Sequence, residues 1–338
     1  MDKVDIIIPA YKPDQKFVTL IGRLEHQSVP VGQIIVMNTE QKYFDRLLYG
    51  ASYQKDYHNI VVKHISKREF DHGRTRNRGV KYSNADYFIM MTQDALPADE
   101  YMVEKLLEPI RSGKAAVAYA RQMPHEESSF VEKFTRSFNY PEQSCIKTKD
   151  DLETLGIKTF FCSNVCAAYN RKIFDELGGF VKHTIFNEDM IYAAKAVEVG
   201  YGIAYAADAR VYHSHNYTNK EQFHRNFDLG VSQADHPEVF AGYPSESEGI
   251  RLVRQTIAYL KEQGQKREIP HVICQSGFKY MGYLLGKNYR KIPKKLVVAL
   301  SSNKEYWGQD NLIKAGSRID ATKGYGRSEQ EIADRTVR

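Results

Sequence analysis

Apolar residues in the first third of the chain follow two alternating periods. Short, mostly β-branched runs predict strands at residues 4–8, 33–37, 60–65 and 87–91. Between them, apolar residues recur at helical spacing and predict helices at residues 17–24, 74–82 and 101–110. Because strands that alternate with helices form a sheet covered on both faces, we expect an α/β fold with a mostly parallel sheet.

The rest of the chain continues the sheet and then changes character. Residues 115–120, 202–207 and 210–213 predict further strands, and residues 188–199 predict a helix. An irregular stretch runs up to about residue 158, and residues 160–169 are apolar again. From about residue 219 the pattern is helical, basic and aromatic. We therefore expect an α/β domain over 1–218, a helical C-terminal region over 219–316 and a polar, poorly ordered tail over 317–338.

The composition is typical of a soluble globular protein, since 42% of the 338 residues are hydrophobic and 27% are charged. No apolar run reaches the roughly 20 residues of a membrane-spanning helix, and no signal segment follows Met1. Cys145, Cys162, Cys166 and Cys274 are too few and too scattered for a disulfide framework or a zinc site. These features predict a cytoplasmic protein that contacts a membrane only at its surface.

Positive charge gathers in the C-terminal region, although the net charge of the whole chain is only +6. No acidic residue lies between Glu268 and Glu305, and cations alternate with aromatic residues over 278–295. One interpretation is an ordinary helix with a solvated basic face. The other is a surface that docks on the anionic inner leaflet, where a lipid-linked acceptor resides. No nucleic-acid-binding motif accompanies the charge, so nucleic acid is not an expected partner, and the oligomeric state stays open.

Polar residues follow three of the predicted strands at the point where each strand ends. They are Pro9-Ala10-Tyr11, Asn38-Thr39-Glu40 and Gln93-Asp94. Ligands of parallel α/β sheets bind at the carboxyl ends of the strands, so these residues are expected to share one crevice. There Asp94 would offer a hard oxygen ligand to Mg²⁺ or Mn²⁺, unless it only forms a turn before the next helix.

Other polar groups are also candidates for chemistry. Glu188 and Asp189 open a predicted helix, where acids serve as caps or where one of them could deprotonate an acceptor hydroxyl. His213 and His215 lie on one side of a predicted strand, which suits a metal site but also occurs among surface histidines. A basic turn at 66–77 could bind a diphosphate or remain a solvated loop. No GxxxxGK[ST] or GxGxxG sequence occurs, which argues against P-loop NTPases and dinucleotide-dependent dehydrogenases.

Five short motifs follow one another over about two thirds of the chain. They are Val-Asp-Ile-Ile-Ile-Pro-Ala-Tyr at 4–11, Asp-His-Gly-Arg-Thr-Arg-Asn at 71–77, Thr-Gln-Asp-Ala at 92–95, Asn-Glu-Asp-Met at 187–190 and His-Ser-His at 213–215. Their order and spacing resemble glycosyltransferase family 2, above all its bacterial rhamnosyltransferases. The resemblance implies a GT-A (Rossmann-like) fold, a nucleoside-diphosphate sugar donor, a divalent cation and transfer with inversion at the anomeric carbon.

The resemblance also implies a role for each matching residue. Asp189 corresponds to the catalytic base and Glu188 to its supporting neighbour. Asp94 corresponds to the metal-binding acid, with His213 or, as the less favoured choice, His215 as a further metal ligand. The nucleotide-sugar site would consist of Pro9, Ala10, Tyr11, Asn38, Thr39, Glu40, Asp71, Arg74, Asn77, Gln93 and Asp94.

The metal motif departs from the family, because Thr92 and Gln93 stand where many members carry additional acids. Fewer charged ligands should weaken binding of Mg²⁺ or Mn²⁺. A dTDP-β-L-rhamnose donor would yield an α-L-rhamnoside on a glycan or lipid-linked glycan of a cell-surface polysaccharide. The residues leave a UDP-hexose or UDP-N-acetylhexosamine donor open. A rival of another class is a non-catalytic protein that binds anionic lipid or nucleic acid through its basic region.

Overall fold

The computed structural model describes residues 3–47, 58–243 and 246–308, so the predicted tail over 317–338 lies outside the described residues. Within these ranges a 9-stranded sheet has the strand order β3-β2-β1-β4-β8-β6-β9-β5, and β7 pairs with β9. The strands are β1 (Val4–Tyr11), β2 (Ile34–Thr39), β3 (Ile60–Ile65), β4 (Tyr87–Met91), β5 (Leu96–Pro97), β6 (Val117–Met123), β7 (Cys145–Lys147), β8 (Cys166–Asn170) and β9 (Ile203–Tyr212).

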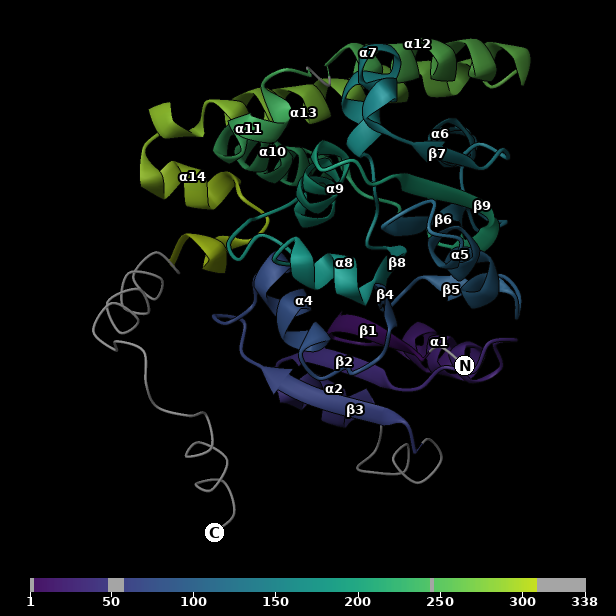
Figure 1. The fold of residues 1–338 in the computed structure, drawn as a ribbon. Helices are drawn as coiled ribbons and strands as arrows, with labels where there is room; N and C mark the ends of the chain where they lie inside the picture. The colour runs from purple at the N-terminus through teal and green to yellow at the C-terminus, as the bar shows by residue number, and fades with distance from the viewer. Residues whose placement is uncertain (1–2, 48–57, 244–245, 309–338) are drawn as a thin grey trace.

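Helices cover both faces of the sheet, and the C-terminal helices form a group on the side away from β3 (Figure 1). The α-helices are α1 (Gln15–Glu25), α2 (Gln41–Leu47), α4 (His72–Val80), α5 (Met102–Arg111), α6 (Phe130–Asn139), α7 (Leu152–Leu155), α8 (Arg171–Glu176), α9 (Glu188–Glu198), α10 (Asn219–Asp235), α11 (Pro237–Phe240), α12 (Glu246–Glu262), α13 (Ile269–Lys287) and α14 (Lys294–Leu300). Short 3₁₀ helices are η1 (Lys149–Asp151), η2 (Gly156–Phe160), η3 (Lys266–Glu268), η4 (Tyr289–Lys291) and η5 (Lys304–Gly308).

The strands are apolar on both sides because each face of the sheet packs against helices. On β1, Ile6 and Ile8 belong to the core cluster that includes α1 and α5, whereas Ile7 belongs to the opposite cluster with α8 and α9. β1 pairs in parallel with β2 and β4, and β2 with β3, while β8 runs antiparallel to β4 and β6. The chain thus reverses its order of strands between β1 and β4, which is where doubly wound sheets bind ligands.

The structure corrects or completes the sequence prediction in three segments. Residues 203–212 form one strand rather than two, because a bulge against β6 at Ala120 and Arg121 absorbs the polar interruption. The apolar stretch at 160–169 is divided between the end of η2, a loop and β8, which begins at Cys166. The stretch predicted as irregular contains α6, whose Phe134 stacks on Tyr259 of α12 at a centroid distance of 4.8 Å.

The C-terminal helices pack closely through glycines. A Cβ atom on Gly286 of α13 would lie 2.0 Å from the Phe227 carbonyl oxygen of α10, so the two backbones touch there. η5 then returns toward the loop before α9, where Tyr306 stacks on His183 at a centroid distance of 4.4 Å. In the part of the chain that the structure describes, no helix has both the length and the apolar content needed to cross a bilayer.

Candidate active site

The carboxyl ends of β1 and β4 meet at the point where the strand order reverses. The Gln93 Oε1 accepts the Tyr11 backbone N–H at 2.8 Å, and the Gln93 Nε2 donates to the Tyr11 carbonyl at 3.0 Å. Pro9 and Ala10 precede Tyr11 in β1, where Pro9 is half-buried and Ala10 is buried. This double hydrogen bond holds the loop after β1 beside Asp94, so the two polar segments predicted to share a crevice lie together.

The Tyr11 ring forms an aromatic and cationic surface at this edge. The Tyr43 ring lies edge-on at 5.6 Å, and the Nζ atoms of Lys12 and Lys67 lie 5.4 and 5.0 Å from the Tyr11 ring centroid. Although desolvation acts in the opposite direction, the hydrogen bond and charge of Lys67 lower the pKa of the Tyr11 hydroxyl. A ring flanked by ammonium groups suits a nucleobase whose phosphates lie nearby.

The end of β2 is more deeply buried than the end of β1. Asn38 is fully buried, and its Nδ2 lies 3.0 Å from the His64 Nδ1. The Asn38 Oδ1 and Thr39 Oγ1 have no hydrogen-bond partner within the described ranges. Glu40 is partly exposed, and its Oε1 accepts the Lys67 backbone N–H at 3.0 Å. Glu40 is therefore the most accessible of these three predicted donor-binding residues.

Asp71 and Asn77 have structural roles that the sequence did not reveal. Asp71 is fully buried, its Oδ1 caps the first turn of α4 at 3.0 and 2.9 Å, and its Oδ2 accepts the Thr184 backbone N–H at 3.2 Å. Asn77 pairs with both backbone groups of Phe180 at 2.9 and 3.0 Å. These side chains fix α4 against residues 178–184. Arg74 lies outside this contact and lines a basic cavity of about 210 Å³.

Asp94, His213 and His215 come together in one cluster at the ends of β4 and β9. The His215 Nε2 lies 3.2 Å from the Asp94 Oδ2 and 2.9 Å from the His213 Nε2, and the His213 Nε2 lies 3.7 Å from the Asp94 Oδ1. Neighbouring ligands of an octahedral cation with bonds of about 2.1 Å are about 3 Å apart. The three side chains therefore fit a single divalent cation and leave its other positions for oxygen ligands.

Both histidines are held in the neutral state that a metal ligand requires. His213 is buried, and burial followed by the nearby His215 and arginine charges moves its pKa well below the usual range. Burial also lowers the pKa of His215, although the Asp94 carboxylate opposes this shift. Two neutral imidazoles beside a partly exposed carboxylate can bind a cation without a change in their net charge.

Glu188 and Asp189 open α9 in two different environments. Glu188 is buried, and its Oε1 lies 3.2 Å from the Arg76 Nη1 and accepts the Asn164 Nδ2 at 3.0 Å. Burial acts to raise the pKa of Glu188, but Arg76, His72 and Asn164 outweigh it and keep the group ionised. Asp189 is only half-buried, and burial together with the Glu188 charge raises its pKa to about 7. The accessible carboxylate is thus tuned for proton transfer near neutral pH.

Two neighbouring residues connect the acid pair with the histidine cluster. The Asn164 backbone N–H donates to the Asp189 Oδ2 at 2.9 Å, and the Ser163 Oγ accepts the Gln122 Nε2 at 2.9 Å. The Gln122 Oε1 in turn lies 3.0 Å from the His213 Nδ1. Because Ser163 and Asn164 are adjacent in the chain, these hydrogen bonds link the two parts of the site.

Backbone strain also collects at this edge of the sheet. In the described ranges, the non-glycine residues with left-handed φ values are Lys12 at 49°, Glu40 at 66° and Asn187 at 63°. They lie in the loops after β1 and β2 and directly before Glu188. Such conformations cost energy and are concentrated at functional sites.

Arg225 of α10 approaches the site from the C-terminal region. Its guanidinium carbon lies 4.6 Å from the centroid of Tyr217 and 5.6 Å from that of Phe186. The Tyr217 ring contacts His215 at 4.9 Å, and the Phe186 ring lies 6.0 Å from His72. Arg225 therefore lies between the histidine cluster and the Glu188 side of the site, where a guanidinium can bind phosphate oxygens.

The sequence analysis missed several residues that organise this site. Arg76 was noted only as one of the cations of the basic turn at 66–77, whereas the structure pairs it with the buried Glu188. Asn164, Gln122 and Arg225 belong to no motif, and only their long-range contacts identify them. A second cavity, larger than the one beside Arg74, is lined by residues that have structural roles.

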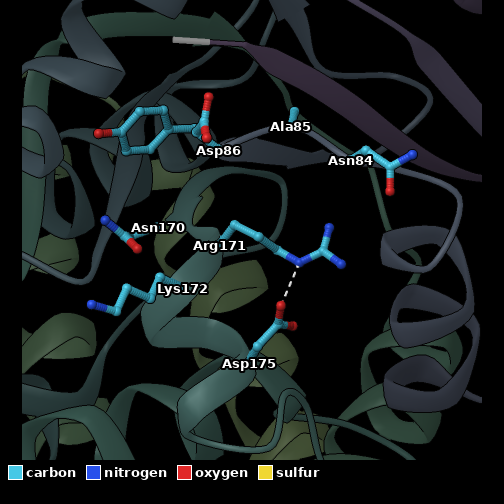
Figure 2. A pocket seen from close by; sticks show the side chains of 8 residues that line it. Asn84, Ala85, Asp86, Asn170, Arg171, Lys172 and Asp175 are labelled. Carbon is cyan, nitrogen blue, oxygen red and sulfur yellow. Dashed lines mark hydrogen bonds and ion pairs between the residues drawn. The ribbon is translucent and has the colours of Figure 1, made fainter.

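That cavity, of about 520 Å³, lies where β4 begins and β8 ends, at the edge opposite Asp94. Arg171 extends toward Asp175 within it (Figure 2), and the Arg171 Nε donates to the Asp175 Oδ2 at 2.7 Å. The Arg171 Nη1 also donates to the carbonyls of Val80 and Ser83. These hydrogen bonds connect α8 to the end of α4, so Arg171 has a structural role.

Comparison with known proteins identifies the family of the chain. The sequence profile of glycosyl transferase family 2 matches residues 5–178. The chain is 38% identical over 309 residues to the O-antigen chain rhamnosyltransferase RfbN of Salmonella typhimurium, an alignment that covers 90% of this chain and 96% of the relative. It is 39% identical over 312 residues to the O-antigen chain rhamnosyltransferase WbaN of Salmonella anatum, covering 91% and 96%.

Solved structures share the fold at low sequence identity. The mannosyltransferase PcManGT from Pyrobaculum calidifontis, in complex with GDP-Man and Mn²⁺, has a TM-score of 0.50 at 12% identity, over 95% of this chain and 88% of that one. S. aureus TarS 1-349, in complex with UDP-GlcNAc, has a TM-score of 0.50 at 14% identity, over 86% and 92%. The expected GT-A architecture is confirmed. The chain belongs to glycosyl transferase family 2 and is a glycosyltransferase.

Proposed function

We propose that the protein transfers L-rhamnose from dTDP-β-L-rhamnose to a glycan acceptor, with inversion, during synthesis of an O-antigen chain. The two relatives that cover nine tenths of the chain are both O-antigen chain rhamnosyltransferases. The structural observation that carries the proposal is the cluster of Asp94, His213 and His215. It is linked to the half-buried Asp189 through Gln122 and the segment Ser163-Asn164. In the proposed reaction the cluster would hold the cation that binds the donor diphosphate, and Asp189 would accept the proton of the acceptor hydroxyl.

In the proposed reaction, Asp189 removes the proton of the acceptor hydroxyl as that oxygen attacks the anomeric carbon. The bond from the anomeric carbon to the diphosphate breaks on the opposite face, and the nucleoside diphosphate leaves with the electron pair. Glu188 stays ionised beside Arg76 and keeps the pKa of Asp189 raised. Arg225 lies where its guanidinium can bind the departing phosphates. No covalent intermediate with the protein is needed.

The cation proposed for Asp94, His213 and His215 is Mn²⁺ rather than Mg²⁺. Mg²⁺ prefers oxygen ligands, whereas two imidazoles and one carboxylate suit a transition metal better. Both histidines reach the cluster, so both are proposed as ligands. A bound cation would supply a Lewis acid that neutralises charge on the departing diphosphate. PcManGT is described with Mn²⁺, which is consistent with this choice.

The decisive experiment measures release of nucleoside diphosphate from a panel of dTDP-, UDP- and GDP-sugars, with Mn²⁺, Mg²⁺ or a chelator. We expect turnover of dTDP-rhamnose with Mn²⁺ and its loss in Asp94→Ala and Asp189→Asn. Asp208→Asn is the matched control, because Asp208 is an exposed carboxylate of β9 outside the site. Turnover of a UDP-sugar instead would keep the mechanism but replace the donor.

The acceptor is proposed to be lipid-linked, with α13 facing the membrane that carries it. One face of α13 packs against α10 through Tyr283 and Gly286, while Ile273, Tyr280, Met281 and Leu284 are exposed on the other. These four positions recur at helical spacing and form an apolar stripe. Exposed cations follow the stripe directly, namely Lys291, Lys294 and Lys295. An apolar stripe that ends in cations complements an anionic bilayer surface.

Vesicle sedimentation tests this surface. The protein should pellet with vesicles that contain phosphatidylglycerol and remain in solution with pure phosphatidylcholine. Replacing Tyr280, Met281 and Leu284 with serine should reduce binding, whereas Ile250→Ser on α12 serves as an exposed apolar control. Equal binding to neutral vesicles, or unchanged binding of the triple variant, would contradict the proposal.

A further inference from the structure

Gln122 is a buried amide of β6 whose hydrogen-bonding positions are filled by four different side chains. Its Nε2 donates to the Tyr140 hydroxyl at 2.6 Å and to the Ser163 Oγ at 2.9 Å. Its Oε1 accepts the Arg136 Nη1 at 2.5 Å and lies 3.0 Å from the His213 Nδ1. A buried amide with this many partners has one well-defined orientation.

Arg136 determines which end of the amide faces His213. A guanidinium has donors and no acceptor, so the Gln122 atom that contacts it must be the oxygen. The Arg136 Nε is itself held by the Glu132 Oε1 at 2.7 Å within α6. Because the same oxygen faces the His213 Nδ1, this nitrogen must carry the proton. The His213 Nε2 then keeps its lone pair on the side of Asp94 and His215.

We propose that Gln122 is a positioning residue that holds His213 in the tautomer protonated at Nδ1, with Nε2 directed into the Asp94 cluster as a ligand. The inference rests on the proposed cation site, whose ligands must offer lone pairs. In the other tautomer an N–H would point at the cluster and block it. Gln122 thereby acts on the cation through His213 without touching it.

The tautomer can be read directly from the metal-free protein by ¹⁵N–¹H correlation spectra of the histidine rings. The His213 signals, assigned with His213→Gln, should show a protonated Nδ1 and an unprotonated Nε2 in the natural chain. Gln122→Met removes the acceptor at similar volume and should give a mixture of tautomers. Gln122→Glu keeps an oxygen opposite Nδ1 and should restore protonation of Nδ1. Gln255→Met, at an exposed position of α12, is the control.

Arg136→Met provides a second route if Gln122→Met does not fold. Without the guanidinium the amide can rotate by half a turn, since Tyr140 and Ser163 both donate and accept. We expect this variant to show both tautomers as well. A single tautomer protonated at Nδ1 in Gln122→Met or Arg136→Met would overturn the proposal, and so would a natural chain protonated at Nε2.

Manganese affinity, measured from the EPR signal of free Mn²⁺, provides the second readout. Gln122→Met should weaken Mn²⁺ binding by about 10- to 100-fold, the range typical when a partner of a metal-bound histidine is removed. Gln122→Glu and Gln255→Met should stay within about 3-fold of the natural chain. Unchanged affinity in Gln122→Met refutes the positioning role. Absence of Mn²⁺ binding in the natural chain would instead refute the proposed cation site, while the ring spectra would still decide the tautomer.

Discussion

Replacing Arg76 with methionine is expected to destabilise the protein by about 3–5 kcal/mol at pH 8, the cost of removing one partner from a buried ion pair. The side chains of Arg76 and Glu188 are 7% and 5% exposed, and their closest atoms are 3.2 Å apart. Methionine replaces much of the apolar stem but leaves the Glu188 carboxylate buried without a guanidinium. The Asn164 amide, which remains, is neutral and offsets only part of the loss.

The loss should shrink as the pH falls. In the natural chain the pKa of Glu188 is lowered, so the pair contributes stability above the unfolded pKa of about 4.3 and loses it below the folded value. In Arg76→Met, burial without its partner raises the pKa of Glu188, so the penalty grows as the pH rises above about 4.3. The difference in unfolding free energy should therefore be clearly smaller at pH 5 than at pH 8.

Urea unfolding followed by fluorescence of Trp307, the single tryptophan, measures both values. Arg78→Met is a matched control on the same helix, because Arg78 faces Glu69 at 3.5 Å with side chains 45% and 54% exposed. A surface pair of this kind contributes about 0–1 kcal/mol. Equal losses in the two variants, or an Arg76→Met loss that is the same at pH 5 and pH 8, would refute the reasoning.

Three further outcomes are expected. The rise of kcat/KM with pH should have its midpoint near 7. Glu188→Gln should move this midpoint to lower pH, because it removes a charge that raises the pKa of Asp189. A midpoint that does not move would exclude Asp189 as the titrating base. Gly286→Ala, with its Cβ 2.0 Å from a backbone oxygen, should cost about 1–3 kcal/mol in thermal unfolding, whereas Gly277→Ala in open space on the same helix should not destabilise. His215→Ala should weaken Mn²⁺ binding in calorimetric titration more than Mg²⁺ binding, and equal effects would count against an imidazole ligand.

The first half of the fold was predictable because its strands are buried on both sides. Residues such as Ile6, Ile7 and Ile8 must all be apolar when helices cover both faces, which makes these strands stand out as continuous runs. α6 was missed because it buries none of its residues completely and packs against α12, more than one hundred residues later. The predicted break in β9 is a real irregularity that a bulge absorbs without ending the strand.

The candidate site was predictable only where a motif carried it. Asp94 precedes His213 by 119 residues along the chain, and the resemblance linked it to His213 and His215 before the structure did. The same resemblance assigned Asp71 to the donor, and the structure adds a cap of α4 and a hydrogen bond to Thr184, neither of which was predicted. Gln122 stayed invisible because a glutamine in a strand has no local signal, and its role depends on partners contributed by other elements.

The adjacent residues Ser163 and Asn164 couple the acid pair at the start of α9 to the histidine cluster. A displacement of this segment would alter the hydrogen bond to Asp189 and, through Gln122, the one to His213 at the same time. The effects of substitutions in the two halves should then not sum, because a first change already disturbs what the second would remove. A substitution that introduces a new base or a new metal ligand must therefore preserve the hydrogen bonds of the other half as well.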